Sequence, residues 1–168
     1  MPLNPDSPLT RLMLAPVRAG RVVWVGLRAA RRVPLVEVQS ARASTEEGLA
    51  GDHYSRKGGN RQITLIEAES LRAIASHLGR ERVTPFELRR NVVTEGINLH
   101  ALKDRQFRIG SALLEMTGEC HPCSRMEETF GVGGYNAVRG FGGITARVVE
   151  EGMIEVGSSV EPLFCPTP

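Results

Sequence analysis

The sequence has no long hydrophobic segment. Its longest apolar stretches, such as Val22 to Leu27, are far shorter than the roughly 18 apolar residues that a membrane-spanning helix requires. Residues 1–8 contain three prolines and no basic leader ahead of an apolar core, so the N-terminus lacks the pattern of a signal peptide. We therefore expect a cytoplasmic protein without a membrane partner.

The sequence also has little excess charge. Its 21 Lys and Arg residues face 19 Asp and Glu residues, which gives a formal net charge of +2 at pH 7. A chain this nearly balanced lacks the overall positive charge typical of nucleic-acid binders, so we expect no nucleic-acid partner. A local basic cluster occurs at Arg28, Arg31 and Arg32. We expect a solvated loop there, and contact with an anion is the alternative.

Cysteine is scarce as well, with Cys120, Cys123 and Cys165 as its three positions. An odd number of cysteines in a chain long enough to bury its own core does not indicate a secreted disulfide scaffold. Each thiol is therefore considered singly, and Cys165, in a proline-flanked tail, is expected to have no role. The length of 168 residues fits a single domain with one core.

Glycine, by contrast, is abundant, with 18 residues in 168, which favours short strands joined by turns. The pattern of apolar and β-branched residues predicts strands at 21–27, 35–39, 61–66, 91–94, 106–109, 112–117, 144–149 and 153–156. We expect the last two strands to form a hairpin. One-sided apolar spacing predicts a helix over residues 67–78.

Capping signals predict two shorter helices. Thr84 and Glu87 flank Pro85 at the start of one, which should reach about Arg90, and Ser124 precedes Glu127 by three residues at the start of the other, which should reach Phe130. The sum is a β-dominated α+β fold, a curved and barrel-like antiparallel sheet with two or three short helices. It forms a single domain over residues 1–168, with irregular structure expected at 1–20 and 161–168.

The segment Cys120-His121-Pro122-Cys123 is the most suggestive for chemistry, because a thiolate can act as a nucleophile, a soft metal ligand or a sulfur carrier. Cys123 comes just before the helix expected at 124–130. The free N–H groups at a helix start favour a thiolate, and Arg125 can add to that effect.

Other interpretations of these cysteines stay open. Buried packing is a common role for cysteine, and the C-x-x-C spacing of Cys120 and Cys123 also suits a redox pair. A zinc site would need further ligands from Cys165 or from scattered histidines.

Three other segments carry candidate ligand-binding residues. Asp52 and His53 lie in a polar, glycine-rich loop over 48–60, where His53 could bind a ligand, transfer a proton or simply be exposed in a turn. Arg90 and Asn91 end a short helix, and a guanidinium there can bind phosphate or carboxylate. The glycine turn 139–143 can direct backbone amides at an anion, but it lacks the spacing of a nucleotide-binding loop.

Five segments taken in order form a combined pattern that is specific, although no one of them is: GLAGDH at 48–53, RQITLI at 61–66, LRRNVV at 88–93, PC at 122–123 and GGITARV at 142–148. In this pattern the chain resembles the MOSC domain family, the C-terminal domains of molybdenum cofactor sulfurases and their stand-alone relatives. The resemblance is strongest over residues 33–160.

The resemblance implies a β-barrel-like fold that binds the molybdenum cofactor, a molybdopterin. Its single key cysteine, matched by Cys123, would ligate the metal or carry a persulfide sulfur and would be the catalytic residue. Cofactor contacts are assigned to the matching motifs and the glycine segments: Arg90, Asn91, Asp52, His53, Arg139, Gly142 and Gly143.

The chain departs from larger relatives in several ways. It has no aminotransferase-like domain, so pyridoxal phosphate is not expected, and it has no room for the N-terminal domain of amidoxime-reducing relatives. The family's late Gly-Asp pair is replaced around Gly157, and Cys120 is an addition without an assigned role.

We expect a molybdenum-dependent oxidoreductase that reduces small N-hydroxylated substrates, with electrons from a reductase partner. The alternative is a carrier of persulfide sulfur or of cofactor, without turnover, that works with a sulfur-donor protein.

Overall fold

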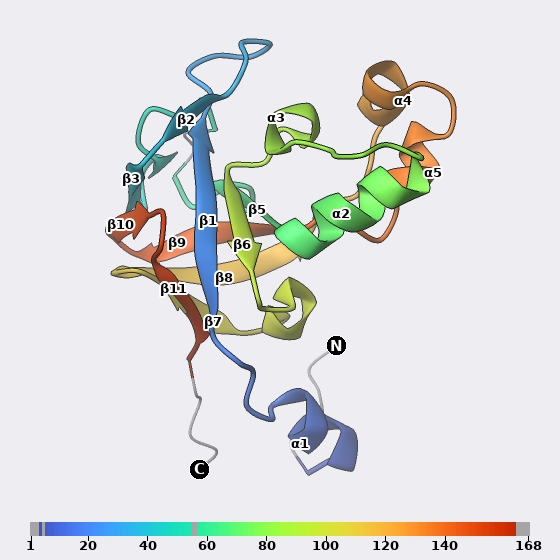
Figure 1. Ribbon diagram of the computed structural model, residues 1–168. Helices are drawn as coiled ribbons and strands as arrows, with labels where there is room; N and C mark the ends of the chain where they lie inside the picture. The colour runs from blue at the N-terminus through green and yellow to red at the C-terminus, as the bar shows by residue number, and fades with distance from the viewer. Residues whose placement is uncertain (1–3, 5, 55–56, 164–168) are drawn as a thin grey trace.

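The computed structural model describes residues 4, 6–54 and 57–163. Its centre is a curved sheet that closes into a barrel (Figure 1). Seven strands form the barrel: β1 (Gly20–Leu27), β5 (Ile63–Glu67), β6 (Val92–Glu95), β7 (Gln106–Ile109), β8 (Ala112–Glu119), β9 (Ile144–Glu150) and β11 (Ser159–Pro162). They pair in the order β11-β7-β8-β9-β5-β6-β1, and β1 pairs with β11 to close the ring. The β-dominated α+β fold expected from the sequence is confirmed.

The barrel is mixed rather than wholly antiparallel. Strands β5 and β6 run parallel, with Leu65 opposite Val92, whereas the other pairs between described barrel strands are antiparallel. Parallel neighbours need a long crossover connection. Helices α2 (Ala68–His77) and α3 (Pro85–Leu88) lie in that connection. The all-antiparallel expectation is therefore wrong at this pair.

A second, smaller sheet lies beside the barrel. It contains β3 (Ser40–Ser44), β4 (Gly48–Leu49) and β10 (Gly152–Glu155), in the order β10-β3-β4, while β2 (Val36–Val38) pairs with β1. The hairpin expected from 144–149 and 153–156 is therefore wrong, because β10 pairs with β3 instead of β9. Gly152 lies so close to the backbone of Ser111 and Ala112 that a side chain would collide there, and the Met153 N–H donates to Ser111 Oγ. These contacts direct the chain away from β9.

The predicted helices are present, but their starts differ in detail. Thr84 and Glu87 form the expected capping box at α3, with the Thr84 N–H donating to the Glu87 carboxylate over 2.8 Å. Helix α4 (Arg125–Phe130) begins without a side-chain hydrogen bond from Ser124, so the box expected there is wrong. Glu127 instead accepts from the backbone N–H groups of Gly133 and Tyr135 and so holds helix α5 (Gly134–Val138) against α4.

The sequence analysis missed three short helices: α5, η1 (Leu99–Leu102) and α1 (Pro8–Met13). Helix α1 corrects the expectation of an irregular segment at 1–20. Ser7 caps it by accepting from the Leu9 N–H, and Pro8 suits a first helical turn because no partner is needed for its nitrogen. At the other end, β11 includes Glu161 and Pro162, so that segment is not irregular before Leu163. The tail with Cys165 lies outside the described residues.

Two apolar clusters hold the fold together. The barrel interior is filled by inward-facing aliphatic and aromatic side chains, as in β7, where Phe107 and Ile109 are buried between more exposed neighbours. The second cluster packs Ile74 of α2 and Leu88 of α3 against the outward side of the sheet at Val93. No helix among the described residues is long and apolar enough to cross a membrane. The two clusters thus stabilise the barrel, and the connections between its strands can carry the residues of a binding site.

Candidate functional site

A pocket of about 260 Å³ lies where four segments meet. These are the loop after β1, the connection between β4 and β5, the end of α3 and the start of α4. The described residues that line the pocket are Arg28, Arg31, His53, Tyr54, Arg61, Leu88, Arg89, Arg90, Cys123, Arg125 and Met126. Six guanidinium groups and one thiol thus surround one cavity, and none of these described residues carries a carboxylate.

Cys123 lines this pocket and is exposed, whereas Cys120 is only 3% exposed and does not line it. The two cysteines differ because Cys120 ends the strand region, where its N–H donates to Gly143 O over 2.8 Å. Cys123 lies in the turn before α4, and its carbonyl accepts from the Met126 N–H. Among the described residues, no group of three or more His, Cys, Asp or Glu could hold a metal ion. The pocket therefore offers one thiol, Cys123.

Arg90 is buried, with 5% exposure, yet it lines the pocket without a carboxylate partner. Its Nε donates to Gly142 O over 2.8 Å and its Nη1 to Leu88 O over 2.6 Å. Burial lowers the pKa of Arg90 below its ordinary value, the nearby Arg61 acts in the same direction, and the two cysteines oppose it. The guanidinium is thus fixed by two carbonyl groups, and its charge is only partly compensated.

Gly142 and Gly143 are not among the described residues that line the pocket, and the cofactor contacts assigned to them stay a prediction. A side chain on Gly142 would collide with Cys120 O, and one on Gly143, which has a φ of +82°, would collide with Leu65 O. These glycines are needed because backbones approach closely here. Arg139 is exposed at the end of α5 and also lies outside the pocket lining. The turn therefore supports the pocket through Arg90 and supplies none of its lining.

Asp52 and Asn91 form an internal polar network instead of contacting the pocket. The Asn91 amide accepts from the Thr64 N–H and Oγ1 and donates to Gly26 O and to Asp52 Oδ1. Asp52 also accepts from the backbone N–H groups of Arg28 and Tyr54. Both side chains are buried and engaged within the protein, so in this structure they support the wall of the pocket, and their assignment as cofactor contacts stays a prediction.

His53 does line the pocket, and its Nδ1 is buried without a hydrogen-bond partner. The Nε of Arg28 is likewise buried and unpartnered, although Arg28 is only 7% exposed. A third such atom, Thr94 Oγ1, belongs to a residue outside the pocket. Buried polar groups in proteins are usually paired, so two unpartnered nitrogens in residues that line one cavity mark it as a candidate ligand site.

Tyr54 links the arginines of the barrel side. The guanidinium carbons of Arg28 and Arg61 each lie 5.6 Å from the centre of its ring, and the ring of His53 packs edge-on at 4.2 Å. Cations at this distance are attracted to an aromatic face, which restricts where the two guanidiniums can point. Tyr54 therefore helps to hold two charges at one wall of the pocket.

Four of the lining residues were missed by the sequence analysis: Arg28, Arg31, Tyr54 and Arg61. The expectation of a solvated loop is wrong for Arg28, which is buried. No local pattern could have found the whole group, because it comes from two connections that are distant in the sequence, the one after β1 and the one before β5. The alternative of anion contact for the 28–32 cluster was the one signal that pointed to it.

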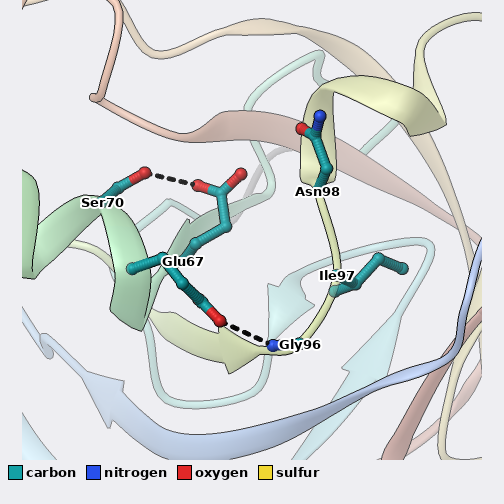
Figure 2. A pocket seen from close by; sticks show the side chains of 6 residues that line it. Glu67, Ser70, Gly96, Ile97 and Asn98 are labelled. Carbon is teal, nitrogen blue, oxygen red and sulfur yellow. Dashed lines mark hydrogen bonds between the residues drawn. The ribbon is translucent and has the colours of Figure 1, made fainter.

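A second hollow lies on another side of the barrel, between the start of α2 and the turn after β6 (Figure 2). Its acids are already paired. Glu67 accepts from Ser70 Oγ and the Leu99 N–H, and Glu69 accepts from the Gly96 N–H. These carboxylates stabilise the surrounding turns, so this hollow lacks the unpaired groups that distinguish the arginine-lined pocket.

The fold is similar to several solved structures of low sequence identity. The YuaD protein from Bacillus subtilis has a TM-score of 0.76 and 19% identity, with 87% of this chain and 96% of that chain covered. YiiM from Geobacillus stearothermophilus has a TM-score of 0.70 and 16% identity, covering 86% of this chain and 75% of that one. YiiM from Escherichia coli has a TM-score of 0.65 and 19% identity, with coverages of 85% and 69%. At these identities the likeness concerns the fold.

No curated protein matches the sequence. The family model described as MOSC domain matches residues 50–161, a stretch that includes most of the barrel and both the Arg90 and the Cys123 segments. This is about two thirds of the chain, and it agrees with the barrel topology and with the single pocket thiol. The chain belongs to the MOSC domain family, which is associated with the molybdenum cofactor.

Proposed function

We propose that this MOSC protein binds the molybdenum cofactor and reduces small N-hydroxylated substrates, such as N-hydroxylated base analogues, with Cys123 as the protein ligand of molybdenum. One observation carries the proposal. The exposed thiol lines a pocket of six guanidinium groups whose described lining includes no carboxylate and two residues with buried, unpartnered nitrogens.

The residues present fit this cofactor in two respects. A thiolate is the kind of soft ligand that molybdenum accepts beside the sulfur atoms of the pterin. The phosphate at the other end of the cofactor requires hydrogen-bond donors and positive charge. Arg28 Nε, which is buried without a partner, and the guanidinium of Arg90 are available for this purpose.

The bound cofactor supplies a redox metal that can take oxygen from the substrate. In the overall reaction the N–O bond breaks, the oxygen leaves as water, and two electrons and two protons are consumed. We assign the electrons to a reductase partner. Among the pocket residues, Arg90 stays fixed by its two carbonyl contacts, and His53 can deliver a proton from its imidazole ring to the departing oxygen.

The rival function is transport of sulfur or cofactor without turnover. It is favoured by the exposure of Cys123, because a persulfide sulfur must be reachable by a donor and an acceptor protein. The six arginines favour the first function, since a sulfur atom on a thiol needs no cationic pocket.

Metal analysis and a turnover assay together separate the two functions, because a cofactor carrier would contain molybdenum but would not reduce the substrate. The protein is produced with molybdate in a host that makes the cofactor, and metals are measured in the freshly purified sample. We expect roughly stoichiometric molybdenum and reduction of an N-hydroxylated base with a suitable reductase. Absence of molybdenum, together with a mass gain of one sulfur atom on Cys123 after incubation with a cysteine desulfurase, would favour the carrier and overturn our proposal.

A further inference from the structure

The pocket contains more positive charge than the proposed cofactor can compensate. None of its six arginines forms an ion pair with a described residue. Six other arginines of the chain each pair with a glutamate: Arg21, Arg42, Arg72, Arg80, Arg108 and Arg147. Elsewhere in the described part of the chain, glutamates thus pair with arginines, but no glutamate or aspartate is among the described residues that line the pocket.

Crowded guanidiniums are costly when no anion is present. Arg28 and Arg90 are both more than nine-tenths buried, and Arg61 further lowers the pKa of Arg90 after the effect of burial. Burial disfavours the charged form, and a neighbouring like charge disfavours it again. A ligand with several negative charges would relieve both effects.

The cofactor alone does not supply enough negative charge. A phosphate monoester carries about −1.5 to −2 at neutral pH, and a thiolate adds one more negative charge. These two groups together compensate about half of the six guanidiniums. The remaining positive charge includes Arg31 and Arg61, which are exposed at the mouth of the pocket where a substrate must enter.

We propose that the substrate itself carries a phosphate, so that the protein acts on N-hydroxylated nucleotides in preference to free bases or nucleosides. The phosphate would bind Arg31 and Arg61, with Tyr54 holding Arg61 in place by its ring contact. A dianion can engage two guanidinium forks at once. This inference rests on the proposed function and specifies its substrate class.

A mononucleotide fits this site better than a nucleic-acid strand does. The pocket of about 260 Å³ is smaller than the roughly 300 Å³ of ordinary small-molecule sites, so beside the cofactor it has room for the phosphate end of a small molecule, bound at the exposed Arg31 and Arg61, and not for an extended strand. A strand would need positive charge along an extended groove, and the whole chain carries a net charge of only +2. Preferential binding of a single-stranded oligonucleotide over a mononucleotide would contradict the proposal.

Calorimetric titration tests the phosphate site without relying on turnover. Cytidine 5′-monophosphate and cytidine, which resemble the reduced products, are titrated into cofactor-loaded and cofactor-free protein. We expect the nucleotide to bind at least about tenfold more tightly than the nucleoside, because charge-assisted hydrogen bonds are among the strongest polar contacts. Inorganic phosphate should compete with the nucleotide.

Matched variants locate the phosphate. The double variant Arg31→Gln with Arg61→Gln should lower nucleotide affinity about tenfold or more and leave cytidine affinity unchanged. Arg32→Gln is the control, because Arg32 is an exposed neighbour in the same loop that does not line the pocket. Both variants remove surface charge, so a general effect of charge would appear in both. A folding defect would lower the affinity for cytidine as well as for the nucleotide.

The outcomes keep the two proposals separate. Equal affinity for nucleotide and nucleoside, or equal effects of the double variant and Arg32→Gln, would overturn the substrate proposal. Nucleotide binding that disappears when the cofactor is loaded would also overturn it, because the nucleotide would then occupy the cofactor's place. Absence of molybdenum, with nucleotide selectivity retained, would overturn the proposed function and support the phosphate site.

Discussion

Two polar clusters meet at the pocket end of the barrel, and they differ in how completely they are hydrogen-bonded. In the first, Asn91 uses its whole amide on Thr64, Asp52 and Gly26. In the second, Arg28 Nε and His53 Nδ1 are buried without a partner. The paired cluster supports the fold, and we assign the unpaired cluster to the proposed ligand. The difference shows which polar residues a mutation can remove without unfolding the barrel.

The two clusters are joined through the backbone. Asp52 accepts from the N–H groups of Arg28 and Tyr54, while the side chains of these two residues line the pocket. The paired network thereby fixes where the unpaired groups are placed. This is the usual relation between a binding site and its supporting residues, in which precise placement depends on groups that never touch the ligand.

The largest expected effect concerns the two thiols, one in each environment. Cys123→Ala should reduce molybdenum content and activity to background, because among the described residues it removes the one thiol that lines the pocket. Cys120→Ala should retain most of both, at a stability cost of about 1 kcal/mol for a small buried side chain. Metal analysis of both variants beside the parent tests this. Equal loss in the two variants would indicate a dithiol mechanism in which each thiol needs the other.

The next effect is on stability, in the paired network. Asn91→Leu should lower the free energy of unfolding by about 3 kcal/mol, because it leaves the Thr64 N–H and Gly26 O buried without partners. Urea unfolding measures the change, and Asn136→Leu at an exposed position is the control. A loss below about 1 kcal/mol would mean that water replaces the amide and that the network does not support the fold.

A smaller effect is expected at the capping box of α3, which leads directly into Arg89 and Arg90. Burial tends to raise the pKa of the Glu87 carboxyl, but hydrogen bonds from Thr84 and Arg80 outweigh it and leave the pKa below the ordinary 4.5. Because the folded-state pKa is lowered, the stabilisation is present above the unfolded value and is lost as pH falls through the folded value.

Glu87→Ala should therefore cost about 1 kcal/mol at neutral pH and progressively less below about pH 4. Urea unfolding at both pH values measures the difference between variant and parent. Glu81→Ala, at an exposed loop position, should change stability little at either pH. A cost at Glu87 that does not depend on pH would show that packing of the side chain, and not its charge, supports α3.

The smallest change in stability is expected in the unpaired cluster. Arg28→Met should alter the free energy of unfolding by less than about 0.5 kcal/mol, or increase it, because it replaces an uncompensated buried charge by an apolar chain. Cofactor retention should nevertheless fall. Thermal melting and molybdenum content of the same sample measure the two effects. A large loss of stability with full cofactor content would reverse the assignment of Arg28 to the ligand.

Features that depend on neighbouring residues could be predicted from the sequence, whereas features that depend on contacts between distant segments could not. Local patterns predicted eight of the eleven strands of the described residues and the capping box of α3, because alternation and capping depend on residues within a few positions of each other. They missed β3, β4 and β11, and the box expected at Ser124 is absent. The β9–β10 hairpin and the all-antiparallel sheet failed, because strand pairing depends on contacts between distant segments. Arg139 and the glycine turn lie outside the described lining of the pocket, and a glycine turn can serve close packing as well as ligand binding.

The sequence by itself determined the fold class, the family and the candidate thiol, because each is recorded in residue type and short spacing. Only the tertiary structure decided that Arg28, Arg61 and Arg90 meet in one pocket whose described lining has no carboxylate. It also decided that the side chains of Asp52 and Asn91 form hydrogen bonds inside the protein. The physical reason is that a side chain's role depends on which polar partners the fold brings within hydrogen-bond distance. Neighbours along the chain, such as Arg90 and Asn91, can thus end with opposite roles.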